Sequence, residues 1–202
     1  MTEKTEVGAV AGLLLAAGGG RRLGGHPKAL LTHRGRPLVE HAVGVLRAAG
    51  CARVHVVLGA HADAVREQAT GLADCVLVEN PRWEQGMGGS LLAGLESLVG
   101  TEARAALVLL VDQPGIGAEA VARVRAAYRD ESSLASAAYD GVRGHPVLLG
   151  AAHWAGVAGA ASGDRGARDY LRERESAVTL IECGDVARPY DIDTEADLGH
   201  LE

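Results

Sequence analysis

The strongest constraint on the fold is an alternation of short apolar runs with helical patterns along the chain. The apolar runs are residues 10–17 (VAGLLLAA), 53–59 (RVHVVLG), 74–80 (DCVLVEN) and 105–112 (AALVLLVD), and each has the length of a buried strand. Helical periodicity marks residues 37–49, 62–70, 90–99 and 118–129. This order predicts an α/β fold in which a mostly parallel sheet is covered by helices on both faces.

The remaining elements predict an antiparallel elaboration of that sheet. Residues 133–150 (SLASAAYDGVRGHPVLLG) are typical of two strands that turn at Asp140 and Gly141, and a further strand is expected at residues 177–182. Pro37 is expected in the first turn of its helix and Gly50 at the end of it. Because no linker or repeat interrupts the chain, residues 1–202 are predicted to form a single Rossmann-like three-layer domain, with residues 201–202 set aside as a possible vector remnant.

The balance of charge points to a small anionic ligand. A formal net charge of −6 disfavours nucleic acid as a partner, and the apolar segment 7–17 is too short to span a membrane. However, no acidic residue lies between Glu6 and Glu40. The basic residues in that window are Arg21, Arg22, Lys28, Arg34 and Arg36. The window is either an anion site or a solvated basic loop.

The cysteines and the start of the chain predict a cytoplasmic location. Cys51, Cys75 and Cys183 are widely spaced and form no C-x-x-C pair. No cationic segment and cleavage pattern of a secretory signal surrounds the first apolar run. An odd number of separated thiols is typical of a reducing compartment.

The glycine-rich stretch at residues 13–31 (LLLAAGGGRRLGGHPKALL) predicts a phosphate-binding loop. It is not a dinucleotide-binding G-x-G-x-x-G, because Leu23 stands where the third glycine is needed, and it is not a P-loop, because His26 and Pro27 follow Gly25. Consecutive glycines nevertheless let backbone N–H groups turn toward an anion. Arg22 and Lys28 supply positive charge beside them.

The pattern L-A-A-G-x-G-x-R-x-G followed by Pro27 and Lys28 resembles the signature of the MobA-like nucleotidyltransferases. The resemblance implies a GT-A-type fold whose first loop wraps the triphosphate of an NTP. It implies that Arg22 and Lys28 are catalytic, phosphate-binding residues, with weaker claims for Arg21 and His26. The loop positions carried over as nucleotide-binding are Leu15, Ala16, Ala17, Gly18, Gly19 and Gly20.

A second segment, NPRWEQGMGGSLLAGL at residues 80–95, resembles the family's N-x-x-W-x-x-G-[ML]-x-x-S pattern. The resemblance places Asn80, Gly86 and Ser90 near the base and ribose. Ser90 could instead serve only as the N-cap of the following helix. Trp83 is expected to pack rather than to stack on the base.

Two acidic segments suggest a Mg²⁺ site. Asp112 ends a buried strand, where its carboxylate can hold Mg²⁺ against phosphate oxygens or merely cap the next turn. It matches the metal-binding aspartate of the family, and the resemblance makes Asp112 a catalytic residue as well. The segment DIDTEADL at residues 191–198 resembles the family's D-[IV]-D-T-x-x-D pattern, which makes Asp193 a second Mg²⁺ ligand with Asp191 as the competing choice. Thr194 and Asp197 also form the pattern of a helix start.

Two further segments resemble the molybdenum cofactor cytidylyltransferase branch of the family. They are GHPVLL at residues 144–149 and GDRGARDYL at residues 163–171. The resemblance assigns binding of the acceptor to His145, Gly163, Asp164 and Arg168. The simpler alternatives are a structural histidine in a turn and an exposed arginine paired with Glu173.

Together these features predict a Mg²⁺-dependent nucleotidyltransferase. It would transfer NMP from an NTP, with CTP favoured by Ala17 and the two segments above, to a phosphorylated acceptor and release pyrophosphate. The resemblance implies molybdopterin or the molybdenum cofactor as acceptor and a molybdoenzyme as recipient of the product. An ionised acceptor phosphate needs no general base.

Three alternatives remain open from the sequence. Some MobA-like proteins of catabolic clusters are NAD(P)H-dependent oxidoreductases acting on heteroaromatic pigments, although G-x-G-x-x-G is lacking here. A non-catalytic protein that hands a cofactor to a dehydrogenase is the second. A sugar-phosphate or phospholactate nucleotidyltransferase on the same fold is the third.

Overall fold

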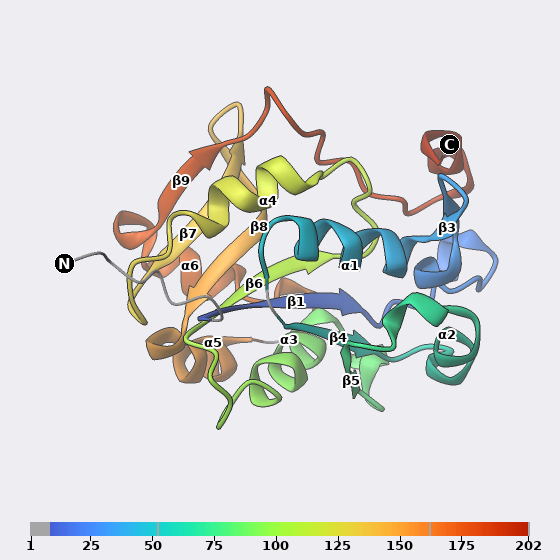
Figure 1. Cartoon of the computed structure of the whole chain (residues 1–202), viewed down its shortest axis with the longest axis horizontal. Helices are drawn as coiled ribbons and strands as arrows, with labels where there is room; N and C mark the ends of the chain where they lie inside the picture. The colour runs from blue at the N-terminus through green and yellow to red at the C-terminus, as the bar shows by residue number, and fades with distance from the viewer. Residues whose placement is uncertain (1–8, 52, 162, 202) are drawn as a thin grey trace.

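The core of the structure is a seven-stranded sheet with the strand order β5-β4-β1-β6-β8-β7-β9. Figure 1 shows the computed structural model, which describes residues 9–51, 53–161 and 163–201. The strands are β1 (Val10–Ala16), β4 (Val54–Leu58), β5 (Val76–Glu79), β6 (Ala105–Leu110), β7 (Leu134–Tyr139), β8 (Val142–Gly150) and β9 (Thr179–Glu182). The mixed α/β fold predicted from the alternating pattern is confirmed.

The parallel half of the sheet comes from the four continuous apolar runs. β1 pairs in parallel with β4 on one side and with β6 on the other, and β5 pairs in parallel with β4. Every residue of β1 and β4 is buried, as expected for strands covered on both faces. The carboxyl ends of β1, β4 and β6 therefore lie at one edge of the sheet.

The helices divide between the two faces of the sheet and enclose two hydrophobic clusters. α1 (Leu38–Ala48), α2 (Ala62–Gln68) and α4 (Ala118–Arg125) contribute buried side chains to one cluster. α3 (Met87–Glu96), α5 (Trp154–Ala160) and α6 (Arg168–Glu173) contribute to the other. In Figure 1, α1 and α4 lie in front of the strands, while α3 and α5 lie below them.

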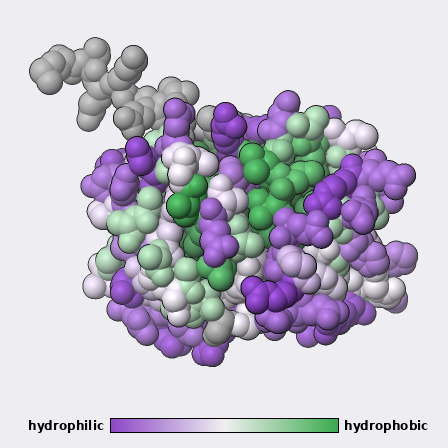
Figure 2. Space-filling view, turned by 90° about the horizontal axis from the view of Figure 1, so that it is seen from below, coloured by the Kyte–Doolittle hydropathy of each residue, from purple (hydrophilic) through white to green (hydrophobic). Residues whose placement is uncertain are grey.

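The side of α3 and α5 is the face seen in Figure 2. On this face, patches of hydrophobic residues lie within a surface that is mostly hydrophilic. Among the described residues, no helix has the length and apolar character that crossing a bilayer requires.

The antiparallel half agrees with the predicted hairpin. β8 runs antiparallel to both β6 and β7, and β9 runs parallel to β7. The turn lies at Asp140 and Gly141, whose φ values of 52° and 77° are both in the left-handed region. Aspartate and glycine tolerate that region better than other residues do, and these two residues therefore specify the turn.

Two predicted helix starts need correction. Pro37 is not in the first turn of α1 but ends the short strand β3 (Arg36–Pro37), which pairs with β2 (Thr32–His33). α3 begins at Met87, so Ser90 lies inside the helix and is not its N-cap. The predicted end of α1 is confirmed, since Gly50 follows it with a φ of 91°.

Candidate active site

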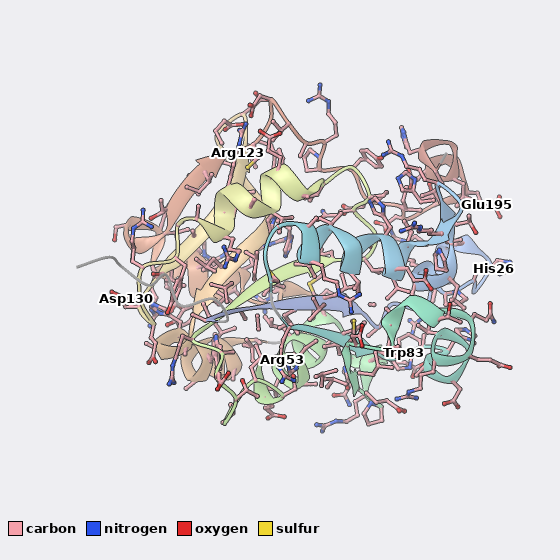
Figure 3. All side chains as sticks on the ribbon, viewed as in Figure 1. His26, Arg53, Trp83, Arg123, Asp130 and Glu195 are labelled. Carbon is pink, nitrogen blue, oxygen red and sulfur yellow. The ribbon has the colours of Figure 1, made fainter. Side chains whose placement is uncertain are left out.

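A cleft of about 1270 Å³ opens where β1 and β6 end and β8 begins. This is the position at which open parallel sheets bind ligands. The cleft is lined by the glycine loop (residues 18–28), the loop after β6, the β7–β8 turn, residues 164–168 and the segment that follows β9. Figure 3 labels His26 and Glu195 at this end of the molecule, and Asp130 at the opposite end.

The glycine loop folds back on itself through short-range hydrogen bonds. Leu23 and Gly25 donate their backbone N–H groups to the carbonyl oxygen of Gly20, at 2.8 and 3.0 Å. Gly20 has a φ of 58°, and a Cβ atom there would overlap the carbonyl oxygen of His26. The tight turn therefore requires glycine at this position.

Trp83 supports the glycine loop from the side of β4. A Cβ atom on Gly19 would meet the Trp83 ring at 2.8 Å, and one on Gly59 would meet the Trp83 Cβ at 2.5 Å. Both glycines therefore allow the indole to pack closely beneath the loop. This geometry favours the packing role expected for Trp83.

The two arginines of the loop differ in their surroundings. Arg21 lies 5.9 Å from the centre of the Trp83 ring and 3.7 Å from a carboxylate oxygen of Glu84. Arg22 lines the cleft and has no ion pair within the described ranges. Of these two arginines, Arg22 is therefore the one whose guanidinium could bind an anion in the cleft.

The centre of the cleft holds an ionic cluster of Lys28, Asp112 and Asp193. The ammonium of Lys28 donates to Oδ2 of Asp112 at 2.7 Å and also to Oδ1 of Asp193. The side chain of Lys28 is only 13% exposed, that of Asp112 20% and that of Asp193 45%. Burial acts to lower the pKa of Lys28, but the two carboxylates outweigh it and the pKa is raised. Lys28 is therefore a cation at neutral pH.

Three distant parts of the chain bring this cluster together. Lys28 begins η2 (Lys28–Leu30), Asp112 follows the end of β6, and Asp193 lies in the segment after β9. The backbone N–H of Ile192 donates to the carbonyl oxygen of Asp112 at 2.9 Å, which sets the two aspartates side by side. Asp197 accepts the N–H of Asp193 at 3.1 Å. The helix start predicted at Thr194 is confirmed as a capping box with Asp197.

Asp191, the competing choice for the second carboxylate, has a different partner. It accepts a hydrogen bond from Nε2 of Gln113 at 2.8 Å. Burial raises the pKa of Asp191, and the charges of Asp112 and Asp193 raise it further, while Gln113 opposes them. Lys28 forms its second ion pair with Asp193, whereas Asp191 is bonded to Gln113. Gln113 is absent from the residues that the sequence singled out.

The two carboxylates of the cluster could hold a divalent cation together with substrate phosphates. In the part of the chain that the structure describes, no three or more His, Cys, Asp or Glu side chains form a group that could hold a metal. Mg²⁺ usually takes one or two carboxylates and completes its shell with water and substrate phosphates. Asp112 and Asp193, both within reach of one ammonium, provide that donor set.

The residues predicted to lie near the base are only partly in the cleft. Ser90 and Gly86 line it, whereas Asn80 lies behind Ser90 and donates to its Oγ at 3.1 Å. Asn80 and Ser90 are both buried. A Cβ atom on Gly86 would meet Oδ1 of Asp164 at 2.7 Å, so glycine at this position lets the segment that begins at Gly163 pack directly against it. In the first loop, Ala16 is buried and does not line the cleft.

The residues predicted to bind the acceptor lie on the wall formed by β8 and α6. His145, Asp164 and Arg168 line the cleft, while Gly163 lies just outside its lining. Burial lowers the pKa of His145 to about 4, and the charge of Arg168 adds to this effect. The ring is therefore neutral at pH 7.

Arg168 does not form the pair with Glu173 that was considered as an alternative. Glu173 lies 3.5 Å from Arg174 instead, and Arg168 has no ion pair among the residues described. Arg143 also lines the cleft, two positions before His145 on β8. Arg143 was not among the site residues predicted from the sequence, although alternation along a strand places it on the same side as His145.

The fold and the cleft define a protein of the nucleotidyltransferase class. The model of the MobA-like NTP transferase domain matches residues 12–178, and the chain belongs to this family. A molybdenum cofactor guanylyltransferase of Shewanella amazonensis is 30% identical over 137 residues, which are 68% of this chain and 66% of the relative. The chain is also 43% identical to a nicotine blue oxidoreductase of Paenarthrobacter nicotinovorans over 98% of each protein.

Solved structures agree with this assignment. Rv0371c of Mycobacterium tuberculosis superposes with a TM-score of 0.82 and 27% identity over 98% of each chain. A second structure of Rv0371c is a complex with manganese, and it superposes with a TM-score of 0.77 and 25% identity over 96% of this chain and 97% of that one.

Proposed function

We propose that this protein transfers a nucleoside monophosphate from an NTP to a phosphorylated small molecule, with Mg²⁺ as the cofactor. The contact of Lys28 with both Asp112 and Asp193 beside the glycine loop carries the proposal. This arrangement offers cationic and metal-binding groups at the place where a triphosphate would lie. The manganese complex of Rv0371c supports a divalent cation in this fold.

The glycine loop and the ionic cluster each have a role in this reaction. Backbone N–H groups of the glycine loop and the guanidinium of Arg22 bind the triphosphate. Lys28 steadies the departing pyrophosphate, and Asp112 and Asp193 hold the Mg²⁺. When bound, the ion neutralises negative charge on the phosphate oxygens.

The chemical step needs no side chain as a base. An oxygen of the acceptor phosphate forms a bond to the α-phosphorus, and the bond from the α-phosphorus to the bridging oxygen breaks. The pyrophosphate leaves with that electron pair. Since the acceptor phosphate is already ionised at neutral pH, positioning and electrostatics supply the catalysis.

The finer assignment is CTP as donor and molybdopterin or the molybdenum cofactor as acceptor. Ala17, which lines the cleft, and the segments around His145 and Arg168 support it through their resemblance to the cytidylyltransferase branch. The product would pass to a molybdoenzyme in the cytoplasm. Guanylyltransferases among the relatives make GTP the competitor to exclude.

Pyrophosphate release tests this function. The protein is mixed with molybdopterin, Mg²⁺ and each of the four NTPs in turn, and CTP is expected to give the fastest release. Asp112→Ala should abolish release while the far-UV circular dichroism stays unchanged. Asp74→Ala, at an exposed site outside the cleft, is the matched control and should keep full activity. Release that persists in Asp112→Ala would contradict the proposal.

A second candidate is an NAD(P)H-dependent oxidoreductase acting on a heteroaromatic pigment. The likeness to the nicotine blue oxidoreductase, which extends over 98% of both chains, is the observation that favours it. Thermal shifts with CTP, GTP and NADPH, each with and without Mg²⁺, separate the two functions. Stabilisation by CTP only with Mg²⁺ supports the transferase, and stabilisation by NADPH alone supports the oxidoreductase.

A further inference from the structure

One nitrogen atom of the ionic cluster lies at the point where a metal ion would bridge the two carboxylates. Nζ of Lys28 is within hydrogen-bond distance of Oδ2 of Asp112 and of Oδ1 of Asp193, so one oxygen of each carboxylate faces the same place. A metal ion held between the two aspartates would take these same oxygens, at about 2.0–2.1 Å for Mg²⁺. The ammonium of Lys28 and the metal ion therefore compete for one position.

The two aspartates are held by backbone contacts that do not involve Lys28. The N–H of Ile192 donates to the carbonyl oxygen of Asp112 at 2.9 Å. Oδ2 of Asp197 accepts the N–H of Asp193 at 3.1 Å. Lys28 reaches the carboxylates from a different element, η2, on a flexible four-carbon side chain. The ammonium can thus change partners while both aspartates keep their places.

Lys28 is also joined directly to the loop that would bind the triphosphate. Gly18, Gly19, Gly20 and Lys28 line the same cleft. Phosphate oxygens bound by the N–H groups of this loop would offer the ammonium a second set of anionic partners. The triphosphate itself therefore supplies the charge that can draw Lys28 away from the carboxylates.

The charge of the cluster determines which cation the carboxylates accept. With Lys28 between them, the three side chains carry one net negative charge instead of the two that the aspartates carry alone. A dication that approaches the carboxylates meets the ammonium at a distance where like charges repel strongly unless water screens them. Screening is incomplete, because the side chain of Lys28 is only 13% exposed and that of Asp112 only 20%. The cluster therefore disfavours a free divalent cation.

We propose that Lys28 blocks the metal site against free divalent cations and yields it only to a metal ion that arrives with a triphosphate. The inference rests on the proposed function for the identity of the two ligands, and it adds the condition under which the site takes the metal. The coupling is reciprocal, so the triphosphate raises the affinity for the metal by the same factor as the metal raises the affinity for the triphosphate. Lys28 thus serves first as counter-ion of the carboxylates and then as partner of the phosphates.

Titration of the whole protein with Mn²⁺ alone, followed by the EPR signal of the free ion, tests the block. Lys28→Met is expected to bind Mn²⁺ at least roughly tenfold more tightly than wild type, because it removes the competing charge. Lys28→Arg keeps the charge and should bind Mn²⁺ as weakly as wild type. The matched control Arg22→Met removes an equal charge from the same loop and should leave Mn²⁺ binding unchanged, since Arg22 pairs with neither aspartate in the described ranges.

A double variant shows whether the gain arises at the cluster. Lys28→Met combined with Asp193→Asn should lose the tighter binding of Mn²⁺. Binding that is no tighter in Lys28→Met than in wild type, or a gain that survives Asp193→Asn, overturns the inference. An equal gain in Arg22→Met or in Lys28→Arg also overturns it, because the effect would then not come from the ammonium between the carboxylates.

A measurement on the unblocked question in wild type keeps the test decisive if Lys28→Met does not fold. The chain has two lysines, Lys4 and Lys28, so ¹⁵N NMR of the side-chain ammonium groups, assigned with Lys4→Arg, follows Lys28 by itself. Its signal should stay unchanged with Mg²⁺ alone and shift when inorganic triphosphate is added together with Mg²⁺. A shift with Mg²⁺ alone, or no shift with both, overturns the inference.

This test is separate from that of the proposed function. Pyrophosphate release that fails with every NTP, while Lys28→Met still gains affinity for Mn²⁺, would remove the transferase and leave the block. Pyrophosphate release that depends on Asp112, without any gain of Mn²⁺ affinity in Lys28→Met, would keep the transferase and remove the block.

Discussion

The two walls of the cleft are built in different ways. The loop wall, residues 18–28, is a contiguous segment whose turn is closed by hydrogen bonds to Gly20 from residues three and five positions later. The hairpin wall, residues 139–145 with residues 183–193, is assembled by side chains from distant parts of the chain. Glu182, for example, accepts the N–H groups of Asp140 and Gly141 at 3.1 and 3.2 Å.

A second contact holds the hairpin wall against α4. Arg123 donates to both carboxylate oxygens of Asp185, at 2.7 and 2.9 Å. Such a wall can change by substitution at a few side chains, whereas the loop wall depends on backbone geometry that only glycine permits. This contrast implies that residues on the proposed acceptor side can be substituted more readily than those on the proposed phosphate side.

The largest effect is expected at Asp112, where the two walls meet. Asp112→Asn keeps the shape of the side chain but removes its charge from Lys28 and from the bound metal. The kcat for pyrophosphate release should fall by about 10²–10³-fold, as when one transition-state contact is lost. Steady-state kinetics measure this change, and an unchanged kcat would show that Asp112 takes no part in the chemical step.

Disrupting the loop wall alone should weaken binding of the NTP and leave binding of the acceptor unchanged. Gly20→Ala forces a Cβ atom into the carbonyl oxygen of His26, so the KM for the NTP should rise roughly 10- to 100-fold. Gly24→Ala is the matched control, because Gly24 has a similar φ of 68° with only one side-chain atom, at 3.8 Å, near the added Cβ. An equal rise of KM in both variants would show that the left-handed backbone, and not the clash, decides the loop.

The protonation of His145 in the hairpin wall should affect how the stability of the protein depends on pH. The pKa of His145 is lowered from 6.5 to about 4, so between these pH values the unfolded chain binds a proton that the folded chain does not. Stability is therefore lost as the pH falls through this window. Between pH 6.5 and 4, wild type should lose roughly 1–3 kcal/mol more unfolding free energy than His145→Gln.

Urea unfolding at several pH values measures that difference. His41 and His55 also have lowered pKa values, because of their burial, but they are present in both proteins and cancel in the comparison. Parallel pH curves for wild type and His145→Gln would contradict the expected neutral imidazole.

The smallest effect is expected at Glu182, which positions the turn of the hairpin wall. Glu182→Gln leaves one oxygen to accept from Asp140, Gly141 and Gly184, so the turn should move more freely. The KM for the acceptor should rise roughly 3- to 10-fold, with little change in the KM for the NTP. A rise in the KM for the NTP alone would contradict the division between the walls.

The loop wall and the parallel strands could be predicted because their information is local. Continuous aliphatic runs specified β1, β4, β5 and β6, and the contiguous pattern around Arg22 and Lys28 specified the loop. The start of α3 was misplaced because Gly-Met-Gly-Gly is typical of a turn. Within that helix, a Cβ atom on Gly94 would meet Leu13 at 2.5 Å, so close packing on β1 overrides the low helix propensity of glycine.

The hairpin wall was only partly predictable for the opposite reason. Gln113 and Glu182 belong to no local pattern and gain their roles from partners that the tertiary fold brings near. The pairing of β7 with β8 also shifts its register between Ser136 and Ala137. Short-range periodicity carries no information about such contacts.

Calorimetric titration with CTP tests most directly whether the cluster of Lys28, Asp112 and Asp193 binds a metal-complexed triphosphate. Wild type should bind CTP tightly with Mg²⁺ and at least tenfold more weakly without it, and Asp112→Asn should lose this dependence on the metal. NADPH should bind weakly under both conditions. Tight binding of NADPH without metal, together with CTP binding that ignores Mg²⁺, would contradict the nucleotidyltransferase assignment of this cleft.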